Sequence, residues 1–269
     1  MLLGAWDGVS APQIAAGLLT NYLGKNLVCL DQATSTQDRA KIEAESGAPD
    51  GTAVLADEQT QGRGRFQRTW VSPKGGAILL SLILRPSPDV AASLPIVTSL
   101  AVAKAVRQAT GLHAGIKWPN DIQIGGKKLA GILLDATLRG ERIEYVIAGI
   151  GLNVGIDPAV HPDIADIATS LSREAGRPVG RLPVFSRVMQ EMESLYDTAK
   201  RGESLVDEWK TLLVTLGQRV RVTWQPAAGA IGWQEDGVAE DVDGKGALLL
   251  RKADGSLITV SGGEVSLSA

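Results

Sequence analysis

The run at residues 77–84, A-I-L-L-S-L-I-L, is the feature that most constrains the fold. Its length is that of a strand, and apolar side chains at nearly every position indicate burial on both faces, in the middle of a sheet. A chain of 269 residues can cover both faces of such a sheet, so we expect one main domain with a smaller companion.

The surrounding segments alternate between helical and strand patterns without a regular βαβ repeat. We expect helices over 11–23, 34–46, 93–110, 182–200 and from 204 onward, and strands over 26–31, 52–56, 117–124, 129–138 and 143–150. Ser93 is the expected start of the third helix, with Pro95 in its first turn and Gly111 at its end. Hairpins such as the one at Gly125-Gly126 mix with these helices, so the predicted fold class is α+β, a mixed sheet flanked by helices.

The sequence pattern changes near Leu216. From there the chain shows short strand patterns over 219–224, 237–242, 247–252 and 256–260, punctuated by Asp236-Gly237, Asp243-Gly244 and Asp254-Gly255 as expected turns. This pattern is typical of a small β-barrel, which is too short to be very stable unless it docks on a larger domain. We therefore divide the chain into domains at 1–215 and 216–269.

Composition narrows the possible chemistry. The net charge of −3 argues against broad electrostatic binding to nucleic acid. The histidines are His113 and His161, and the single cysteine, Cys29, lies in an apolar strand pattern typical of a structural thiol. A serine- or cysteine-type triad is hard to assemble from these residues, and no Cys or His spacing suits a metal. Any chemistry must then depend on arginine, lysine and amide side chains, together with a cation supplied from outside the chain.

The predicted location is the cytoplasm. The N-terminus lacks the basic start and apolar core of a signal peptide, and no stretch approaches the ~20 apolar residues of a membrane span. One cysteine excludes a disulfide within the chain, which fits a reducing compartment.

The loop at residues 59–70, Q-T-Q-G-R-G-R-F-Q-R-T-W, is the strongest candidate for a ligand site. Its glycines allow a backbone to approach a ligand closely, its three arginines supply fixed planar charge, and its tryptophan offers a flat stacking face. This combination fits a small anionic or phosphorylated ligand. A solvated turn is the alternative, and it seldom needs three guanidinium groups so close together.

Three further segments carry residues suited to chemistry: Lys117-Trp118-Pro119-Asn120-Asp121, Gly126-Lys127-Lys128-Leu129-Ala130-Gly131 and Gly149-Ile150-Gly151-Leu152-Asn153-Val154. Because side chains alternate along a strand, only one of the two lysines can face a given pocket. We expect Lys128 to face it, sharing its side with Ala130, and Lys127 to be solvated. Each segment also has an ordinary interpretation: Trp118 as core, Asp121 in an Asx turn, and the glycine pair as sheet packing, since Val154 stands where a dinucleotide fingerprint has its third glycine.

Taken in order, these segments resemble the biotin protein ligases. The matching motifs are Ser35-Thr36-Gln37, Gly62-Arg63-Gly64-Arg65-x-x-Arg68-x-Trp70, Lys117-Trp118-Pro119-Asn120-Asp121, Lys128-Leu129-Ala130-Gly131, Gly149-Ile150-Gly151-Leu152-Asn153 and Ser261-Gly262-Gly263-Glu264-Val265-Ser266-Leu267. The resemblance covers residues 18–269 and is highly specific, because separate segments occur in the expected order. It implies a fold like the class II aminoacyl-tRNA synthetases, with 1–215 as a catalytic biotin- and ATP-binding domain and 216–269 as an SH3-like barrel.

The resemblance also implies the reaction and its residues. Biotin is activated by ATP to biotinyl-5′-AMP and is then transferred to a lysine of a biotin carboxyl carrier protein domain. The implied catalytic residues are Lys128, Arg63 and Arg65. The implied biotin contacts are Ser35, Thr36, Gln37, Gln59, Gly62, Arg63, Gly64, Arg65, Trp70, Lys128 and Gly131, and the implied ATP contacts are Arg65, Arg68, Trp70, Lys117, Asn120, Asp121 and Asn153. Mg²⁺ is expected to be held largely by the phosphates, with Asp121 as one candidate ligand.

Three positions depart from the family pattern. Gln37 stands where asparagine is usual, Phe66 stands at a commonly polar position, and Gln67 replaces the third glycine of the loop. We expect a changed ureido contact and a stiffer or differently shaped loop closure. The family includes members with an N-terminal DNA-binding module, and the roughly 25 residues before the first strand are too few for one. We therefore expect the form that acts only as an enzyme.

Other functions remain as alternatives. A lipoate ligase shares the core and the adenylation chemistry, but the full loop at residues 59–70 (the arginine loop) and the C-terminal barrel disfavour this alternative. A non-catalytic biotin or nucleotide sensor would have little need for Lys128, Lys117 and the loop arginines together. A role in binding nucleic acid has the least support, because basic and aromatic residues are not interleaved. The family makes a homodimer plausible, while the sequence identifies neither the oligomeric state nor the particular carrier partner.

Overall fold

The computed structural model describes residues 5–224 and 232–267 of the chain. A seven-stranded sheet forms its centre, in the order β3-β4-β5-β9-β8-β7-β6. The strands are β3 (Leu27–Leu30), β4 (Thr52–Ala56), β5 (Ala77–Leu84), β6 (Gly115–Lys117), β7 (Asp121–Ile124), β8 (Lys127–Arg139) and β9 (Arg142–Asn153). β3 and β4 are parallel and the other neighbours antiparallel. The expected central strand is confirmed, since β5 lies between β4 and β9 with every residue buried.

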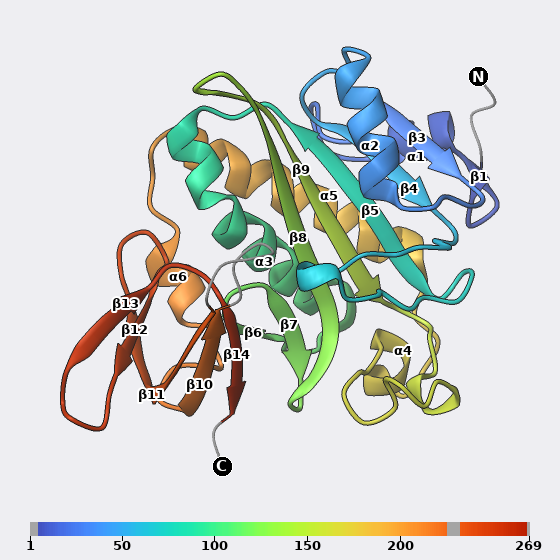
Figure 1. Cartoon of the computed structure of the whole chain (residues 1–269). Helices are drawn as coiled ribbons and strands as arrows, with labels where there is room; N and C mark the ends of the chain where they lie inside the picture. Colours follow the sequence, from blue (N-terminus) through green and yellow to red (C-terminus); the bar gives the residue numbers. More distant parts are fainter. Residues whose placement is uncertain (1–4, 225–231, 268–269) are drawn as a thin grey trace.

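Helices cover the two faces of the sheet unequally (Figure 1). α3 (Pro88–Thr110) and α5 (Arg181–Lys200) lie behind it and enclose the larger core, while α2 (Thr36–Glu45) lies in front of β4, β5 and β9. Alternation along β9 separates the two cores: Ile150 belongs to the rear one and Ile147 to the front one. The part of the front face that α2 leaves uncovered carries the site described below.

The third helix is longer than predicted. α3 begins at Pro88 after the N-cap residue Ser87, so Ser93 and Pro95 lie inside it, while Gly111 ends it in the left-handed conformation as expected. Proline is favourable at a first helical position, and burial of α3 outweighs the hydrogen bond that Pro95 lacks. By length and composition α3 is also apolar enough to span a membrane, contrary to the expectation that no stretch approaches such a span. Its apolar residues pack against the sheet and α5, as in the core helix of a globular domain.

The first helix is shorter than predicted. α1 (Ala11–Gly17) follows a small hairpin of β1 (Ala5–Trp6) and β2 (Val9–Ser10), and the expected helix to residue 23 is wrong. Leu19, just beyond the end of α1, is 80% exposed. The carboxylate of Glu193 on α5 accepts hydrogen bonds from the backbone N–H groups of residues 21, 22 and 23 at 2.6, 2.9 and 2.9 Å. These bonds stabilise a non-helical backbone there.

Shorter elements complete the main domain: α4 (Leu171–Ala175), α6 (Val206–Lys210) and two 3₁₀ turns at Arg65–Gln67 and Pro158–Val160. The helix expected from residue 204 is only α6. It ends before Leu212 because the backbone of residues 212–214 forms hydrogen bonds with β6. Ile116 N–H donates to Leu212 C=O at 2.7 Å, and Val214 N–H donates to Ile116 C=O at 3.0 Å.

The C-terminal unit is a five-stranded antiparallel sheet in the order β13-β12-β11-β10-β14. Its strands are β10 (Arg219–Trp224), β11 (Trp233–Val242), β12 (Leu248–Arg251), β13 (Leu257–Val260) and β14 (Glu264–Leu267). The predicted turn at Asp236-Gly237 is wrong, because both residues lie inside β11. Asp236 pairs with Arg221 across the strands at 2.7 Å, and a Cβ on Gly237 would lie 2.5 Å from the Arg251 carbonyl.

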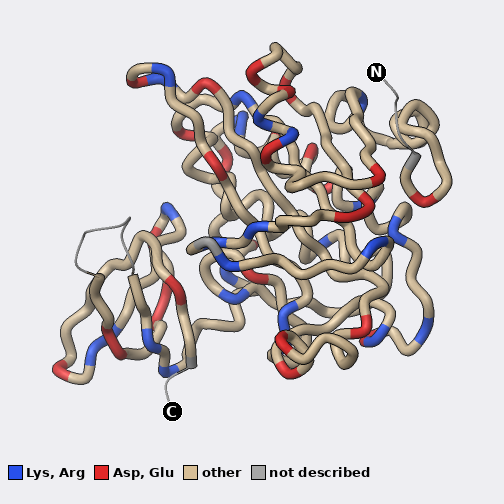
Figure 2. The backbone as a smooth tube through the Cα atoms, turned by 45° about the vertical axis from the view of Figure 1, so that its right-hand side comes forward, with Lys and Arg blue, Asp and Glu red and all other residues tan. Residues whose placement is uncertain are grey.

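The two units are joined through a buried indole. Trp118, 2% exposed, donates from Nε1 to the carbonyl of Gly246 at 3.0 Å. Lys210 and Asp241 add an ion pair at 2.5 Å between α6 and β11. Basic and acidic residues are interspersed along both units in Figure 2.

Candidate functional site

A cavity of about 470 Å³ lies on the front face of the sheet. All of the site residues predicted from the sequence line it, with the exception of Gly62. Its floor is formed by β5, β8 and β9, its upper end by the start of α2, and its cover by the arginine loop. The β6–β7 connection, residues 164–168 and the beginning of β14 complete the walls.

Glycines make the floor of the cavity flat. Gly151 on β9 is paired with Gly131 on β8, and Gly149 lies two residues from Gly151 on the same face. A Cβ on Gly151 would lie 2.6 Å from Cε2 of Trp70, and one on Gly149 would lie 2.9 Å from Cδ of Gln37. Trp70 and Gln37 can therefore lie on the sheet only because these residues lack side chains.

The upper end of the cavity is a buried polar cluster at the start of α2. Ser35 is the N-cap, and its Oγ accepts from Gln37 N–H at 3.2 Å. Thr36 N–H donates to Oε1 of Gln59 at 2.8 Å. Ser81 Oγ lies 2.9 Å from both Thr36 Oγ1 and Gln37 Oε1, and Gln37 Nε2 donates to Asp135 Oδ2 at 3.1 Å. These amides and hydroxyls suit a small polar, uncharged ring.

The arginine loop folds back as a tight hairpin over the cavity. Trp70 N–H donates to the Gly62 carbonyl at 2.9 Å, and a Cβ on Gly62 would lie 2.5 Å from the Trp70 carbonyl. Phe66 has φ of 54°, a left-handed conformation that costs a non-glycine residue free energy. The departure at Phe66 thus falls at a backbone position that glycine would favour, whereas the side chain of Gln67 lies outside the described part of the structure.

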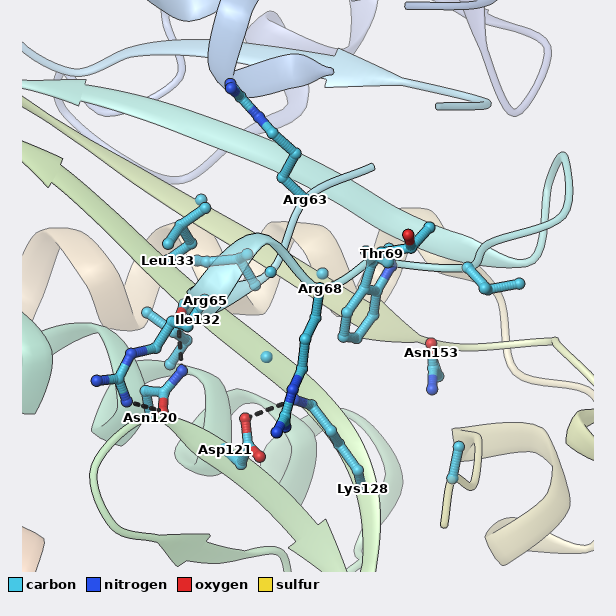
Figure 3. A pocket seen from close by; sticks show the side chains of 18 of the residues that line it. Arg63, Arg65, Arg68, Thr69, Asn120, Asp121, Lys128, Ile132, Leu133 and Asn153 are labelled. Carbon is cyan, nitrogen blue, oxygen red and sulfur yellow. Dashed lines mark hydrogen bonds and ion pairs between the residues drawn. The ribbon is translucent and has the colours of Figure 1, made fainter. Parts of the chain in front are cut away.

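The three arginines fasten this loop to three different elements (Figure 3). Arg65 Nη1 donates to Asn120 Oδ1 at 2.9 Å, on the β6–β7 connection. Arg63 points away from the other labelled cations and pairs with Asp38 on α2. Arg68 pairs with Glu264 on β14, with Nη2 and Oε2 2.7 Å apart. Burial lowers the pKa of Arg65, and an anion beside this guanidinium would offset the cost of desolvation.

The principal cation of the cavity is Lys128. Its Nζ lies 2.7 Å from Asp121 Oδ1 and 5.7 Å from the ring centre of Trp70. It also lies 3.3 Å from the place that a Cβ on Gly131 would occupy, so the ammonium group stands directly above the glycine floor. The ion pair with Asp121 places this group beside the start of β7.

The predicted pairing of Lys128 with Ala130 on one face is wrong. Ile122 pairs with Ala130 whereas Gln123 pairs with Lys128, so Leu129 is an extra residue in the ladder. Such a bulge shifts the alternation of side chains. Leu129 and Ala130 are both buried in the rear core, while Lys128 and Gly131 face the cavity. Lys127 does not line the cavity, in agreement with the prediction.

The remaining predicted residues lie at the far end. Asn153 is 3% exposed, and its Nδ2 donates to the Thr169 carbonyl at 3.0 Å. Its Oδ1 is buried and has no hydrogen-bond partner among the described residues, so it can accept from a ligand. Lys117 lines this end, and Trp118 is mainly a core residue, as its ordinary interpretation predicted.

No group of three or more His, Cys, Asp or Glu residues suited to a metal ion occurs within 5–224 and 232–267. Asp121 offers a single carboxylate, and it is paired with Lys128. A hard cation here would therefore need most of its oxygen ligands from a bound phosphate chain, a donor set that suits Mg²⁺.

Comparison with known proteins identifies the family. Residues 29–153 match the biotin/lipoate A/B protein ligase family, and residues 215–268 match the biotin protein ligase C-terminal domain. The bifunctional ligase/repressor BirA of Bacillus subtilis is 37% identical over 252 residues, which cover 92% of this chain and 76% of that protein. The chain belongs to the biotin protein ligases.

Two further relatives agree with this assignment. The biotin--[acetyl-CoA-carboxylase] ligase of Mycobacterium tuberculosis is 32% identical over 90% of this chain and 88% of its own length. Among solved structures, the biotin protein ligase from Aquifex aeolicus, in complex with biotin and ATP, superposes with a TM-score of 0.76 at 28% identity, covering 91% of this chain and 99% of that one. The α+β fold with a small C-terminal β domain is that of the biotin protein ligases.

Several residues of the site were not found from the sequence. Ser81 and Asp135 join the polar cluster around Gln37, and residues 164–168 form an outer wall by pairing with the backbone of Lys128. Ser81 had a detectable signal, as the one polar residue in an otherwise apolar strand. Asp135 had none, because its role depends on a contact with a residue 98 positions away.

Proposed function

We propose that this biotin protein ligase activates biotin with ATP and transfers the biotinyl group to a lysine of a biotin carboxyl carrier protein domain. The observation that carries the proposal is the position of Lys128. Its ammonium group stands over the glycine floor beside Asp121, in the cavity that the polar cluster of α2, Asn120 and Asn153 also line. The uncharged ring of biotin and the nucleotide would bind in different parts of the cavity, and the carboxylate of biotin would meet the α-phosphate of ATP at this cation.

The first half-reaction joins two anions. A carboxylate oxygen of biotin attacks the α-phosphorus of ATP, the bond from that phosphorus to the bridging oxygen breaks, and pyrophosphate leaves. Lys128 would exchange Asp121 for the two reacting groups, offsetting their repulsion and stabilising the charge that develops on the phosphoryl oxygens. Arg65 would add positive charge from the loop. MgATP is the substrate, with Mg²⁺ on its phosphates and the released Asp121 carboxylate as a candidate ligand.

The second half-reaction needs no nucleophile from the enzyme. The neutral amine of the acceptor lysine attacks the carbonyl carbon of biotinyl-5′-AMP, loses a proton, and displaces AMP. The enzyme contributes by holding the mixed anhydride in place and excluding water, through the arginine loop and Trp70. We assign Ser35, Thr36, Gln37 and Gln59 to the ureido ring, and Arg68, Lys117, Asn120 and Asn153 to the nucleotide. Arg63 would contact the bound ligands only after its ion pair with Asp38 breaks.

We also propose the wider setting of the enzyme. The catalytic domain would comprise 1–215 and the C-terminal domain 216–269, acting in the cytoplasm as a monomer or a homodimer. The beginning of the second matched family at residue 215 supports this boundary. A reducing compartment suits the single buried thiol of Cys29.

Intact-mass analysis of a biotin carrier domain tests the function. The carrier should gain one biotinyl group after incubation with this protein, biotin and MgATP. Lys128→Ala should slow this reaction by about 10²- to 10³-fold, the usual loss when one preorganised charge contact is removed. Lys127→Ala is the matched control, because this neighbouring lysine lies outside the cavity, and it should retain full activity.

The outcomes separate the alternatives. Biotin binding without pyrophosphate release would favour the sensor, and preferential use of lipoate in competition would favour the lipoate ligase. Full activity of Lys128→Ala would keep the ligase and overturn the role assigned to this lysine.

A further inference from the structure

Arg181 is a buried cation that the reaction described so far does not use. It is the first residue of α5 and is 6% exposed. Positive charge is unfavourable at the N-terminal end of a helix, where the backbone N–H groups are already partly positive, and burial adds the cost of desolvation. Two carboxylates offset these costs. Nη2 of Arg181 lies 2.6 Å from Oδ1 of Asp57, and Nε donates to Oδ1 of Asp7 at 2.9 Å.

The guanidinium group of Arg181 lies where β4 and β5 separate. The ladder between these strands ends at the pair of Ala56 and Leu79, although β5 extends two residues beyond it, to Ala77. Past this pair, Arg181 contacts both strands. It forms the ion pair with Asp57, which directly follows β4, and its Nη1 donates to the carbonyl of Ala77 at 3.2 Å.

These two contacts fall at the base of the segment that carries the arginine loop. Gly75 N–H donates to the carbonyl of Asp57 at 3.1 Å, which closes the segment at the same level. Asp57 precedes Gln59 by two residues, and Ala77 is paired with Asn153 on β9. Gln59 and Asn153 both line the cavity. One guanidinium group therefore joins the two points of the chain from which the arginine loop leaves the sheet and returns to it.

The N-terminal hairpin holds Arg181 from another side. Asp7 accepts hydrogen bonds from both Nε and Nη2, and Cζ of Arg181 lies 4.5 Å from the ring centre of Trp6. Asp7 and Asp57 thus share one cation, but only Asp57 belongs to the segment that covers the cavity. This difference separates a contact that supports the fold from one that supports the loop.

We propose that Arg181, acting through Asp57, is a positioning residue that holds the base of the arginine loop and so keeps this loop closed over bound biotinyl-5′-AMP. The inference rests on the proposed function, which supplies this intermediate. Neither residue lines the cavity, so neither is assigned a contact with the ligands. Oδ1 of Asp57 is buried, and without the guanidinium group its charge would be stable only after moving toward water. The base of the loop would move with it.

Dissociation of biotinyl-5′-AMP from the full chain tests this role. The enzyme is loaded with labelled biotin and MgATP in the presence of pyrophosphatase and is then chased with unlabelled biotinyl-5′-AMP, and the label retained is measured by rapid filtration. Asp57→Asn keeps the shape of the side chain and removes its charge. It should raise the dissociation rate about tenfold, because a buried ion pair at the base of the loop is lost. Asp57→Glu keeps the carboxylate and should recover most of the retention.

Asp7→Asn is the matched control, because it removes one carboxylate from the same guanidinium group. Both asparagine variants should lower the melting temperature by similar amounts, whereas Asp7→Asn should keep the dissociation rate within about twofold of wild type. A merely structural role of the cluster would make the dissociation rate follow the melting temperature in both variants.

Arg181→Lys provides an independent second variant. It keeps the positive charge but loses the planar group that reaches Asp57 and the Ala77 carbonyl together, so it should raise the dissociation rate as Asp57→Asn does. In the double variant, the second substitution should add less than about twofold, as expected when two residues act through one contact.

Two outcomes would overturn the inference: a dissociation rate in Asp57→Asn and Arg181→Lys equal to that of wild type, or equal rises in Asp7→Asn and Asp57→Asn. Either outcome, with normal formation of biotinyl-5′-AMP by wild type, leaves the ligase function intact. Absence of biotin-dependent pyrophosphate release by wild type removes the proposed function and this inference together.

Discussion

Replacing Gly151 by alanine should disable the cover of the cavity while leaving the fold intact. The new Cβ would lie 2.6 Å from Cε2 and 2.8 Å from Cζ2 of Trp70, whereas carbon atoms in contact prefer about 3.5–4 Å. The indole, and the loop that carries it, must therefore move outward by about 1 Å. Overpacking of this kind costs about 1–3 kcal/mol. In ligand affinity this corresponds to a loss of about 5- to 150-fold.

Affinity and stability measured together check this reasoning. The biotin Kd of Gly151→Ala should rise within that range, while its melting temperature stays near wild type, because the indole belongs to a surface loop. Gly155→Ala is the matched control: it lies four residues further along, where a Cβ meets nothing within 4 Å, and it should bind normally. When Trp70 is already replaced by alanine, adding Gly151→Ala should lower the affinity for biotin by less than about twofold. Equal affinities of Gly151→Ala and Gly155→Ala would refute the argument.

Three other predictions concern the loop and the thiol. Glu264→Gln removes the negative charge that pairs with Arg68, and because exposed ion pairs contribute about 0–1 kcal/mol, the rate of ligand dissociation should rise by up to about fivefold. In stopped-flow measurements, the difference in ligand dissociation rate between wild type and Glu264→Gln should disappear in about 1 M salt. Proteolysis within residues 60–70 should slow when biotin and MgATP are added, and equal cleavage rates would contradict closure of the loop over the ligands. Burial raises the pKa of Cys29 to about 11, so this thiol stays protonated at pH 8. A colorimetric thiol reagent should therefore modify Cys29 only after the protein is unfolded.

The sequence predicts well where local pattern and tertiary burial agree. The apolar run of β5, interrupted only by Ser81, could only be a central strand, and Gly111 ends α3 because the backbone there is left-handed. Prediction fails where a distant group decides the local structure. α1 stops early because the carboxylate of Glu193, more than 170 residues away in the chain, binds the backbone that follows it. The Asp236-Gly237 pair has turn chemistry, yet it lies in a strand because Arg221 and β12 lie beside it.

The candidate site shows the same division. Motif order identifies which residues meet, and nearly all of those predicted line one cavity. The order of the motifs does not tell which way each side chain points. The bulge at Leu129 depends on the register with β7, and it reverses the expected neighbour of Lys128. The partners of Arg63 and Arg68 lie on α2 and β14, so their outward orientations follow from packing that a linear pattern does not contain.

The junction between Trp118 and Gly246 has a consequence for synthesis of the chain on the ribosome. The indole N–H emerges 128 residues before the carbonyl that accepts from it, and Glu264 emerges later still. A nascent chain that already contains the whole seven-stranded sheet would therefore still have an open side to its cavity. The wall that β14 contributes, and the anchor of Arg68 on Glu264, would be added only after this strand has left the exit tunnel, so the cavity reaches its full form as the last step of synthesis.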